Sequence, residues 1–306
     1  MKIYVIGGGA AGIMAAIYAS DEDTEVTILE KNEKIAKKLF ITGKGRCNIT
    51  NTADYEEYFN NIVSNKNFLR GALRLMPPDS VIKLLNDNGL MTKVERGKRV
   101  FPKSDKSSDV IKTFEKILQQ KNVKIIFNET VTGFVVKDKL IKKIITKNNE
   151  YTPDRVILAT GGKSYKATGS NGSGYKLAEK LGHTIVPLRP GLIPIITKYC
   201  FDAYKNKLDL QNMPSLQGLS LKNVECKILN LNQKTLFKEF GEMLFTHNGL
   251  SGPIILTLSS KINRMDFKDL RLSVDLKPAV DEKTLDNRLI REFESKSNKN
   301  FKNSLN

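Results

Sequence analysis

A glycine-rich turn near the start of the chain, Gly7-x-Gly9-x-x-Gly12, constrains the fold more than any other feature. It follows an apolar, β-branched run over residues 2–6 and precedes small, helix-favouring residues over 10–20. A second apolar run over 25–30 ends in Glu30. Strand, turn, helix and strand within about 30 residues are the minimum that joins two parallel strands, so we predict an α/β fold.

The same turn predicts a dinucleotide site. Gly7 permits the tight turn, Gly9 lets the backbone approach a pyrophosphate, and Gly12 lets the helix pack on the strand. The helix N-terminus offers unpaired N–H groups to the phosphates. Glu30 is placed to accept hydrogen bonds from ribose hydroxyls, which favours FAD or NAD over NADP. The alternative is a glycine turn that binds nothing.

A second glycine cluster, Gly43-Lys44-Gly45-Arg46-Cys47-Asn48, also has the character of a ligand loop. Its glycines let backbone amides converge, and Arg46 and Lys38 are suited to phosphate charge. Arg46 could lower the pKa of Cys47 and make that thiol reactive. Because no other cysteine and no histidine lies nearby in the sequence, we favour a binding loop without a catalytic thiol.

A third cluster follows an apolar run over 155–159, as Ala159-Thr160-Gly161-Gly162, and continues in a glycine-rich segment over 169–174. Ligands of open α/β sheets bind at the carboxyl ends of the strands, which is where these glycine clusters fall.

The spacing of apolar residues and the positions of turn residues predict the remaining helices and strands. We expect helices over 54–90, with a break at 76–79 where Asp79 or Ser80 is a candidate cap, and over 109–120. The basic stretch 93–106 is predicted to be a loop or hairpin. Prolines near 187 indicate a crossing between domains. Strands are expected over 123–127, 131–137, 140–146, 192–197, 219–231, 234–238 and 270–276, and a last helix over 281–295.

Composition excludes several protein classes. The net charge is +17, from 50 basic and 33 acidic residues, but no nucleic-acid recognition motif accompanies it, so we expect a solvated surface and no nucleic-acid partner. Three separated cysteines, Cys47, Cys200 and Cys226, form no CxxC pair, which argues against a metal site and suits a reducing cytoplasm. No run approaches 18 apolar residues, so we expect a cytoplasmic protein without a membrane partner.

Four motifs in series resemble those of the bacterial flavoprotein family that includes BaiN-type bile-acid reductases and aminoacetone oxidase. They are the first glycine turn, the GKGRCN segment, the ATGGKSY segment with its glycine-rich continuation, and GEMLFTHNGLSGP over 241–253. The resemblance covers the whole chain in order. It departs from the family at Lys166, where proline is usual, and at Ser173, where aspartate is usual.

The resemblance implies a glutathione-reductase-like FAD-binding Rossmann domain, interrupted by a β-rich domain and a helical one. It implies that Val131 binds adenine through its main chain. His247 is a candidate proton donor, although a structural turn residue is the favoured interpretation, and His183 is expected to be a helix-end residue. The residues implied to surround FAD are Gly7, Gly9, Ala10, Ala11, Gly12, Glu30, Lys31, Lys38, Gly43, Gly45, Arg46, Cys47, Asn48, Val131, Ala159, Thr160, Gly161 and Gly162.

These observations predict three segments: an FAD-binding domain over 1–188, a β-rich insertion domain over 189–280, and the start of a helical insertion over 281–306. No second glycine-rich strand–turn–helix follows residue 253. We therefore expect that the returning FAD segment is absent from this chain and that activity is impaired.

The leading functional hypothesis is an FAD-dependent, NAD(P)H-linked oxidoreductase that acts on a small organic substrate by two-electron flavin chemistry. A single glycine motif and the lack of paired cysteines exclude a pyridine-nucleotide disulfide reductase. Two alternatives stay open. One is an FAD-binding protein without turnover, or with a nucleic-acid contact role through residues 93–106, and the other is an NAD-dependent dehydrogenase.

Overall fold

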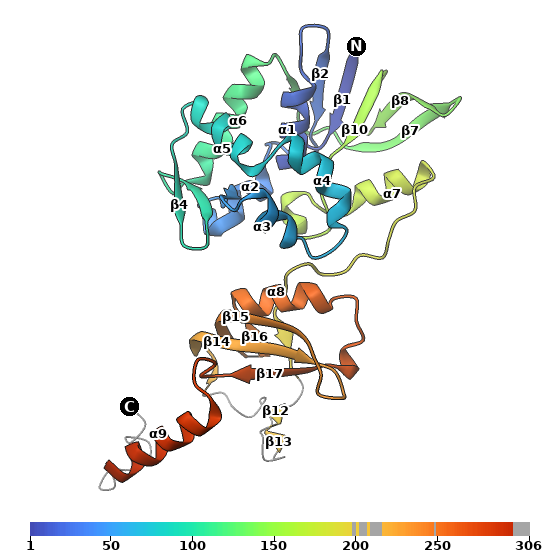
Figure 1. Cartoon of the computed structure of the whole chain (residues 1–306). Helices are drawn as coiled ribbons and strands as arrows, with labels where there is room; N and C mark the ends of the chain where they lie inside the picture. Colours follow the sequence, from blue (N-terminus) through green and yellow to red (C-terminus); the bar gives the residue numbers. More distant parts are fainter. Residues whose placement is uncertain (198–199, 202–206, 209–215, 248, 296–306) are drawn as a thin grey trace. The chain divides into compact units, whose positions relative to one another are not determined.

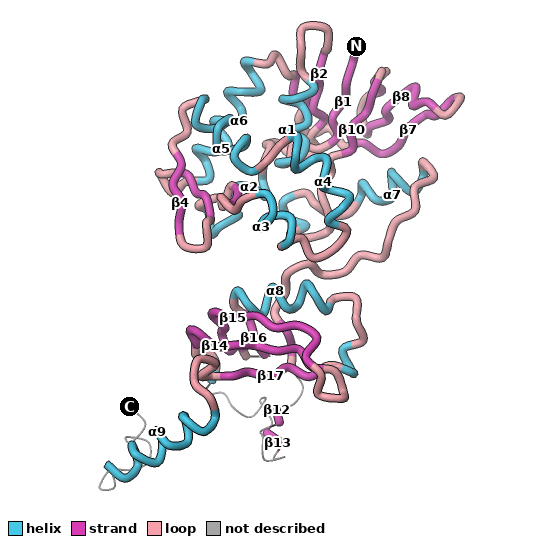
Figure 2. The backbone as a smooth tube through the Cα atoms, viewed as in Figure 1, coloured by secondary structure: helices cyan, strands magenta, loops and turns pink. Residues whose placement is uncertain are grey.

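The computed structural model describes residues 1–197, 200–201, 207–208, 216–247 and 249–295 (Figure 1). The chain divides into two compact units, Met1–Val186 and Pro187–Asn306. Each unit has its own sheet and helices, as the secondary-structure colouring shows (Figure 2). The units are described separately below.

A four-stranded parallel sheet organises the first unit. Its order is β10 (Arg155–Leu158), β1 (Lys2–Ile6), β2 (Glu25–Leu29) and β6 (Lys124–Ile126). Helix α1 (Ala10–Ala19) makes the crossover from β1 to β2, as the glycine turn predicted. The α/β Rossmann fold expected from the sequence is confirmed.

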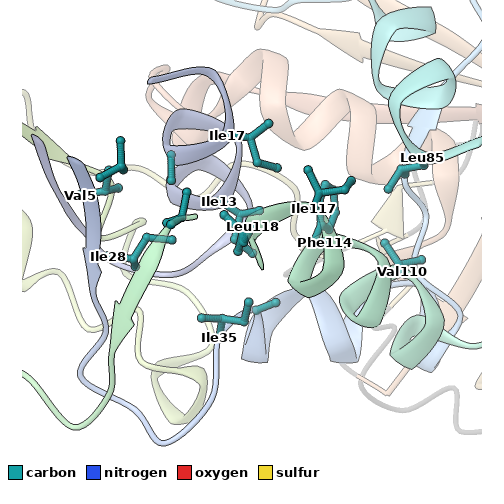
Figure 3. Close-up of a cluster of buried hydrophobic side chains, with 14 of the residues drawn as sticks. Val5, Ile13, Ile17, Ile28, Ile35, Leu85, Val110, Phe114, Ile117 and Leu118 are labelled. Carbon is teal, nitrogen blue, oxygen red and sulfur yellow. The ribbon is translucent and has the colours of Figure 1, made fainter. Parts of the chain in front are cut away.

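One face of this sheet is covered by α1 and α6 (Ser107–Gln120), and α5 (Pro78–Asp87) packs against α6. Figure 3 shows side chains of α1 and α6 between the strand residues Val5 and Ile28 at one end of the cluster and Leu85 of α5 at the other. Ile13 of α1, Ile28 of β2 and Leu118 of α6 are essentially inaccessible to solvent. Since burying one such side chain stabilises the fold by about 1.5–3 kcal/mol, this cluster anchors the sheet edge that carries the glycine turn.

The other face is covered by an antiparallel sheet of β7 (Val131–Lys137), β8 (Leu140–Thr146) and β9 (Glu150–Tyr151), together with α7 (Ser173–Lys180). Val131, Ile144 and Leu177 pack against Ile6 and Leu29 of the parallel sheet. The first unit is therefore layered, with helices on one face of the parallel sheet and a second sheet on the other.

A small antiparallel sheet, β3 (Thr50–Asn51), β5 (Arg99–Pro102) and β4 (Thr92–Glu95), follows α2 (Lys37–Ile41) and the turn η1 (Thr42–Gly45). The stretch predicted as loop or hairpin is thus a hairpin, β4–β5. The region predicted as broken helix contains α3 (Tyr55–Asn60), α4 (Lys66–Leu75) and α5. The expected cap at Asp79 or Ser80 is wrong, because α5 already begins at Pro78, whose fixed φ suits a first helical position.

In the second unit, a five-stranded sheet has the order β11 (Ile195–Ile196), β16 (Gly249–Ser251), β15 (Thr235–Thr246), β14 (Ser220–Leu229) and β17 (Arg271–Asp275). Helix α8 (Pro253–Ile262) packs on it through Ile254, Ile255 and Leu258, which contact Val224 and Met243 of the buried cluster. The remaining described elements are η2 (Lys166–Thr168), β12 (Cys200–Phe201), β13 (Lys207–Leu208), η5 (Phe267–Asp269) and α9 (Glu282–Ser295).

Two strand predictions in this unit need correction. The strand expected over 192–197 is only Ile195–Ile196, since Pro194 has no N–H to donate to a strand ladder. The strand expected over 234–238 continues to Thr246 as β15, because pairing with β14 carries it through Gly241. The expected helix over 281–295 is observed as α9, which has no buried residue.

Candidate functional site

A cavity of about 520 Å³ lies in the first unit where β1, β2 and β10 end at their carboxyl sides. This volume lies within the range of about 300–1,000 Å³ that small-molecule and cofactor sites occupy. All three glycine clusters of the sequence contribute to its lining. The lining residues predicted from the sequence are Gly7, Gly9, Ala10, Ala11, Glu30, Lys31, Lys38, Cys47, Asn48, Val131, Ala159, Thr160 and Gly161.

The first glycine turn leaves room for a ligand at one position only. A Cβ at Gly7 would stand 2.7 Å from the carbonyl oxygen of Ala159, and a Cβ at Gly12 would overlap the carbonyl oxygen of Gly7. A Cβ at Gly9 would meet nothing within 4 Å. Gly7 and Gly12 are therefore required by packing within the chain, whereas Gly9 borders the open cavity at the N-cap of α1.

Glu30 joins the end of β2 to the glycine turn. The residue is 6% exposed, and its Oε2 accepts a hydrogen bond from the N–H of Gly8 at 2.6 Å. Oε1 accepts hydrogen bonds from Asn32, from the backbone N–H at 2.8 Å and from the side-chain amide at 2.7 Å. A carboxylate offers about four acceptor positions, so the pair of oxygens retains capacity for a ribose hydroxyl.

The second loop, residues 42–48, has an unusual backbone. Gly43, Lys44, Gly45 and Cys47 all have positive φ, between 57° and 85°. Cys47 is 2% exposed and lines the cavity, and burial raises the pKa of its thiol, with a partial offset from a hydrogen bond with Thr42. The hypothesis that Arg46 lowers this pKa is wrong, and a neutral thiol does not favour nucleophilic chemistry.

Arg46 does not line the cavity. Its guanidinium forms ion pairs with Glu95 and, at 2.6 Å, with Asp105, and lies over the ring of Phe101 at 4.3 Å. The interpretation of this side chain as a phosphate ligand is therefore not supported by its geometry. Lys38 does line the cavity, with its ammonium 3.3 Å from the hydroxyl of Ser164, and remains suited to the phosphate role.

The third cluster closes the cavity from the side of β10. Gly161 has a φ of +74°, and a side chain there would press on Ser170. A Cβ at Gly174 of α7 would overlap the hydroxyl of Thr160, so α7 approaches the strand end as closely as a glycine allows. Thr160 and Gly161 are cavity residues, and Ser173, one of the two departures from the family, lines it as well.

Several lining residues were missed by the sequence predictions. Asn32 and Glu129 are polar and lie at the same end of the cavity as Glu30, since the N–H of Glu129 donates to the carbonyl of Glu30. Asn32 could have been suspected from its position two residues beyond Glu30. Phe114 is an apolar residue of an amphipathic helix and carries no ligand signal in the sequence.

Some predicted residues lie elsewhere. Gly12, Gly43, Gly45, Arg46 and Gly162 do not line the cavity. His247 is exposed in the turn that follows β15 of the second unit, and its role as proton donor stays a prediction. His183 follows α7, and its N–H donates to the carbonyl of Ala178, as expected of a helix-end residue.

Two other kinds of feature are absent from the described residues. No group of three or more histidine, cysteine, aspartate or glutamate side chains is assembled there to hold a metal ion. No helix in that part of the chain has the length and apolarity needed to cross a membrane.

Residues 1–259 match the sequence-family model of the HI0933-like protein Rossmann domain. A 3-dehydro-bile acid delta(4,6)-reductase of Clostridium scindens is 33% identical over 92% of this chain and 65% of its own length. A ribosomal RNA dihydrouridine synthase of Escherichia coli is 28% identical over 98% of this chain and 69% of its own length. The chain thus spans about two thirds of these relatives.

Among solved structures, Sdh1 of Mycobacterium smegmatis in complex with UQ1 matches with a TM-score of 0.46 and 19% identity. That match covers 72% of this chain and 45% of the other.

Proposed function

The chain belongs to the HI0933-like family of Rossmann-domain proteins, and on that premise we propose that it is an FAD-dependent oxidoreductase linked to NAD(P)H. The observation that carries the proposal is the convergence of three glycine clusters and a buried carboxylate on one cavity. The space beside Gly9 and the carboxylate of Glu30 fit the pyrophosphate and a ribose of a dinucleotide.

The lining residues divide among the parts of FAD. The N-terminus of α1, with Gly9, would hold the pyrophosphate, because its first N–H groups have no partner within the helix. Glu30 would bind the adenosine ribose, and the main chain at Val131 would bind adenine. Lys38 would add positive charge beside the phosphates. The lining residues Cys47, Asn48, Thr160 and Gly161 would face the flavin half.

Bound FAD would supply two-electron chemistry, taking a hydride from NAD(P)H and passing it to the substrate. One relative is named as a delta(4,6)-reductase of a 3-dehydro-bile acid and the other as a dihydrouridine synthase. A 3-keto-4,6-diene and a uracil ring both hold a carbon–carbon double bond conjugated to a carbonyl group. We therefore propose a small organic substrate with such a bond. The chain's own contribution is to bind and orient the cofactor and to shield it within an apolar cavity, bordered by Met14, Leu39 and Leu177.

A second candidate substrate is a uridine in RNA. The net charge of +17 favours it, together with Lys66, Arg70 and Arg74, which follow at four-residue spacing on α4 and lie over the aromatic rings of α3. Retention on an RNA or heparin column separates the two candidates. Binding that persists at physiological salt and weakens steeply above it favours RNA, whereas elution well below physiological salt favours the small substrate.

The cofactor assignment is tested on the purified protein, reconstituted with FAD and desalted. We expect a flavin visible spectrum that bleaches under nitrogen when NADH or NADPH is added, and that recovers when an α,β-unsaturated ketone such as cyclohexenone follows. Retained flavin that neither nucleotide bleaches would support an FAD-binding protein without turnover. A colourless protein that binds NAD would favour the dehydrogenase alternative.

A further inference from the structure

The side chain of Arg46 points away from the cavity that its own loop helps to form. It pairs with Glu95 at the end of β4 and with Asp105 after β5. Lys93 joins the same group, 2.5 Å from Asp105 and 3.5 Å from Glu95. Two cations and two carboxylates therefore form one neutral cluster that connects loop 42–48 with the β4–β5 hairpin.

Phe101 of β5 contacts both this cluster and the backbone of the loop. The residue is 3% exposed, and the guanidinium of Arg46 lies over its ring, 4.3 Å from the centroid. A Cβ at Gly43 would stand 3.2 Å from the same ring. The chain beyond the loop pairs with the same strand, since the N–H of Ile49 donates to the carbonyl of Val100 at 2.8 Å. Loop 42–48 is thus held against β5 by a ring, a charge cluster and a strand pairing.

The loop needs such support because its backbone is strained. Lys44 and Cys47 adopt positive φ without being glycine, a conformation that persists only where the surroundings enforce it. That conformation places Cys47 and Asn48 in the lining of the cavity. Strain at this point is therefore coupled to the shape of the ligand site.

We propose that Arg46 is a positioning residue, which acts through Glu95 and Asp105 to hold loop 42–48 in the cofactor-binding shape and does not contact the phosphates of the dinucleotide. The proposal rests on the proposed function for the identity of the ligand, FAD. Its geometric part, that the cluster holds the loop, is independent of any ligand.

The charges of the cluster agree with this role. Hydrogen bonds from Arg46 and Lys93 hold the pKa of Glu95 below its usual range, and those from Lys93 and Arg46 do the same for Asp105. Both carboxylates are therefore ionised at neutral pH. A phosphate that sought Arg46 would have to displace two carboxylates that already take its donors.

The direction in which one double variant changes the affinity for FAD separates a positioning role of Arg46 from direct contact with the phosphates. In Glu95→Gln/Asp105→Asn, a positioning role predicts a dissociation constant for FAD raised roughly tenfold, the usual weight of losing charged hydrogen bonds. A phosphate-binding Arg46 predicts the opposite, because its guanidinium would be released and FAD would bind more tightly. The matched control is Asp87→Asn, which removes an exposed ion pair with Lys83 in the same unit and should leave the affinity unchanged.

A second readout needs no cofactor. Cys47 is buried by the loop, while Cys226, buried in the second unit, serves as an internal reference. Alkylation of the flavin-free chain, followed by peptide mapping, should show Cys47 reacting roughly tenfold faster in the double variant and Cys226 reacting at its original rate. Unchanged labelling of Cys47, or a parallel rise at both cysteines, would overturn the proposal.

The two measurements also separate this proposal from the proposed function. If the wild-type chain does not bind FAD but Cys47 becomes reactive in the double variant, the loop support stands and the cofactor assignment fails. If FAD binds the wild type and the double variant equally well, or binds the variant more tightly, the assignment stands and the positioning role of Arg46 fails.

Discussion

The loops over residues 7–12 and 42–48 line the same cavity but are held by different means. The first is fixed through its main-chain groups: the N–H of Gly7 donates to Leu29, the carbonyl of Gly8 accepts from Ala36, and the N–H of Gly8 donates to the buried carboxylate of Glu30. The second is held against β5 by the ring of Phe101, by the pairing of Ile49 with Val100, and by the Arg46 side chain, whose partners lie 49 and 59 residues away along the chain. The contacts that hold the first loop therefore fall within one short stretch of sequence, whereas those that hold the second do not.

This difference predicts what substitutions will do. In the first loop, a side chain added at a packed glycine should damage the fold, whereas one added at the open glycine should damage binding alone. In the second loop, the fold should tolerate changes at the cavity face as long as the cluster around Arg46 survives.

Gly12→Ala should destabilise the first unit by about 3 kcal/mol, the upper range for overpacking, because its Cβ would overlap a backbone oxygen that cannot move away. Thermal unfolding followed by circular dichroism measures the loss. Gly71→Ala is the control, since Gly71 lies in α4 with open space around it and should gain up to about 1 kcal/mol in helix propensity. Equal stability of the two variants would contradict the packing role of Gly12.

Gly9→Val should fold like the wild type and lose FAD binding by about 100-fold or more, since its side chain would occupy the space assigned to the pyrophosphate. Circular dichroism checks the fold, and quenching of FAD fluorescence measures the affinity. The affinity of Gly9→Ala for FAD should fall between those of the wild type and Gly9→Val. Undiminished flavin retention in Gly9→Val would remove the pyrophosphate from this part of the cavity.

Glu30→Ala should weaken FAD binding by about 1–3 kcal/mol, the range for charged hydrogen bonds, and should also lower the stability of the apoprotein, because the N–H of Gly8 loses its acceptor. Glu33→Ala, an exposed neighbour that pairs with Lys37, is the control and should change neither quantity. A loss of stability without a loss of affinity would show that Glu30 only supports the turn.

Cys47→Ser should keep both FAD binding and turnover, with a dissociation constant within about twofold of the wild type, equivalent to less than about 0.5 kcal/mol. The thiol is buried and its pKa is raised, so no reactive thiolate is lost. Titration with FAD and anaerobic bleaching by NAD(P)H measure the two properties. Loss of turnover with FAD retained would assign a chemical role to Cys47.

Local patterns predicted most of the first unit. The helix expected over 109–120 is α6, Ser107–Gln120, because its apolar residues recur at helical spacing and pack on the sheet. The strand expected over 155–159 is β10, Arg155–Leu158. These elements carry their signal in neighbouring residues, so no knowledge of distant contacts was needed.

The sequence predictions of site residues were wrong or incomplete where contacts between residues far apart in the sequence determine the position of a side chain. Arg46 reads as a phosphate ligand in its own loop, and only the folded hairpin brings Glu95 and Asp105 to it. Glu129 likewise enters the cavity because β7 follows β6 back towards the end of β2. Such pairings depend on tertiary structure, which a single sequence does not encode in a local pattern.

Titration of the flavin-free chain with FAD, in competition with ADP, FMN and NAD, tests the assignment of the cavity most directly. Since we assign the glycine turn and Glu30 to the adenosine and pyrophosphate half, we expect FAD to saturate at one equivalent per chain and ADP to compete with it, while FMN does not. FMN binding as tightly as FAD, or displacement of FAD by equimolar NAD, would contradict the assignment.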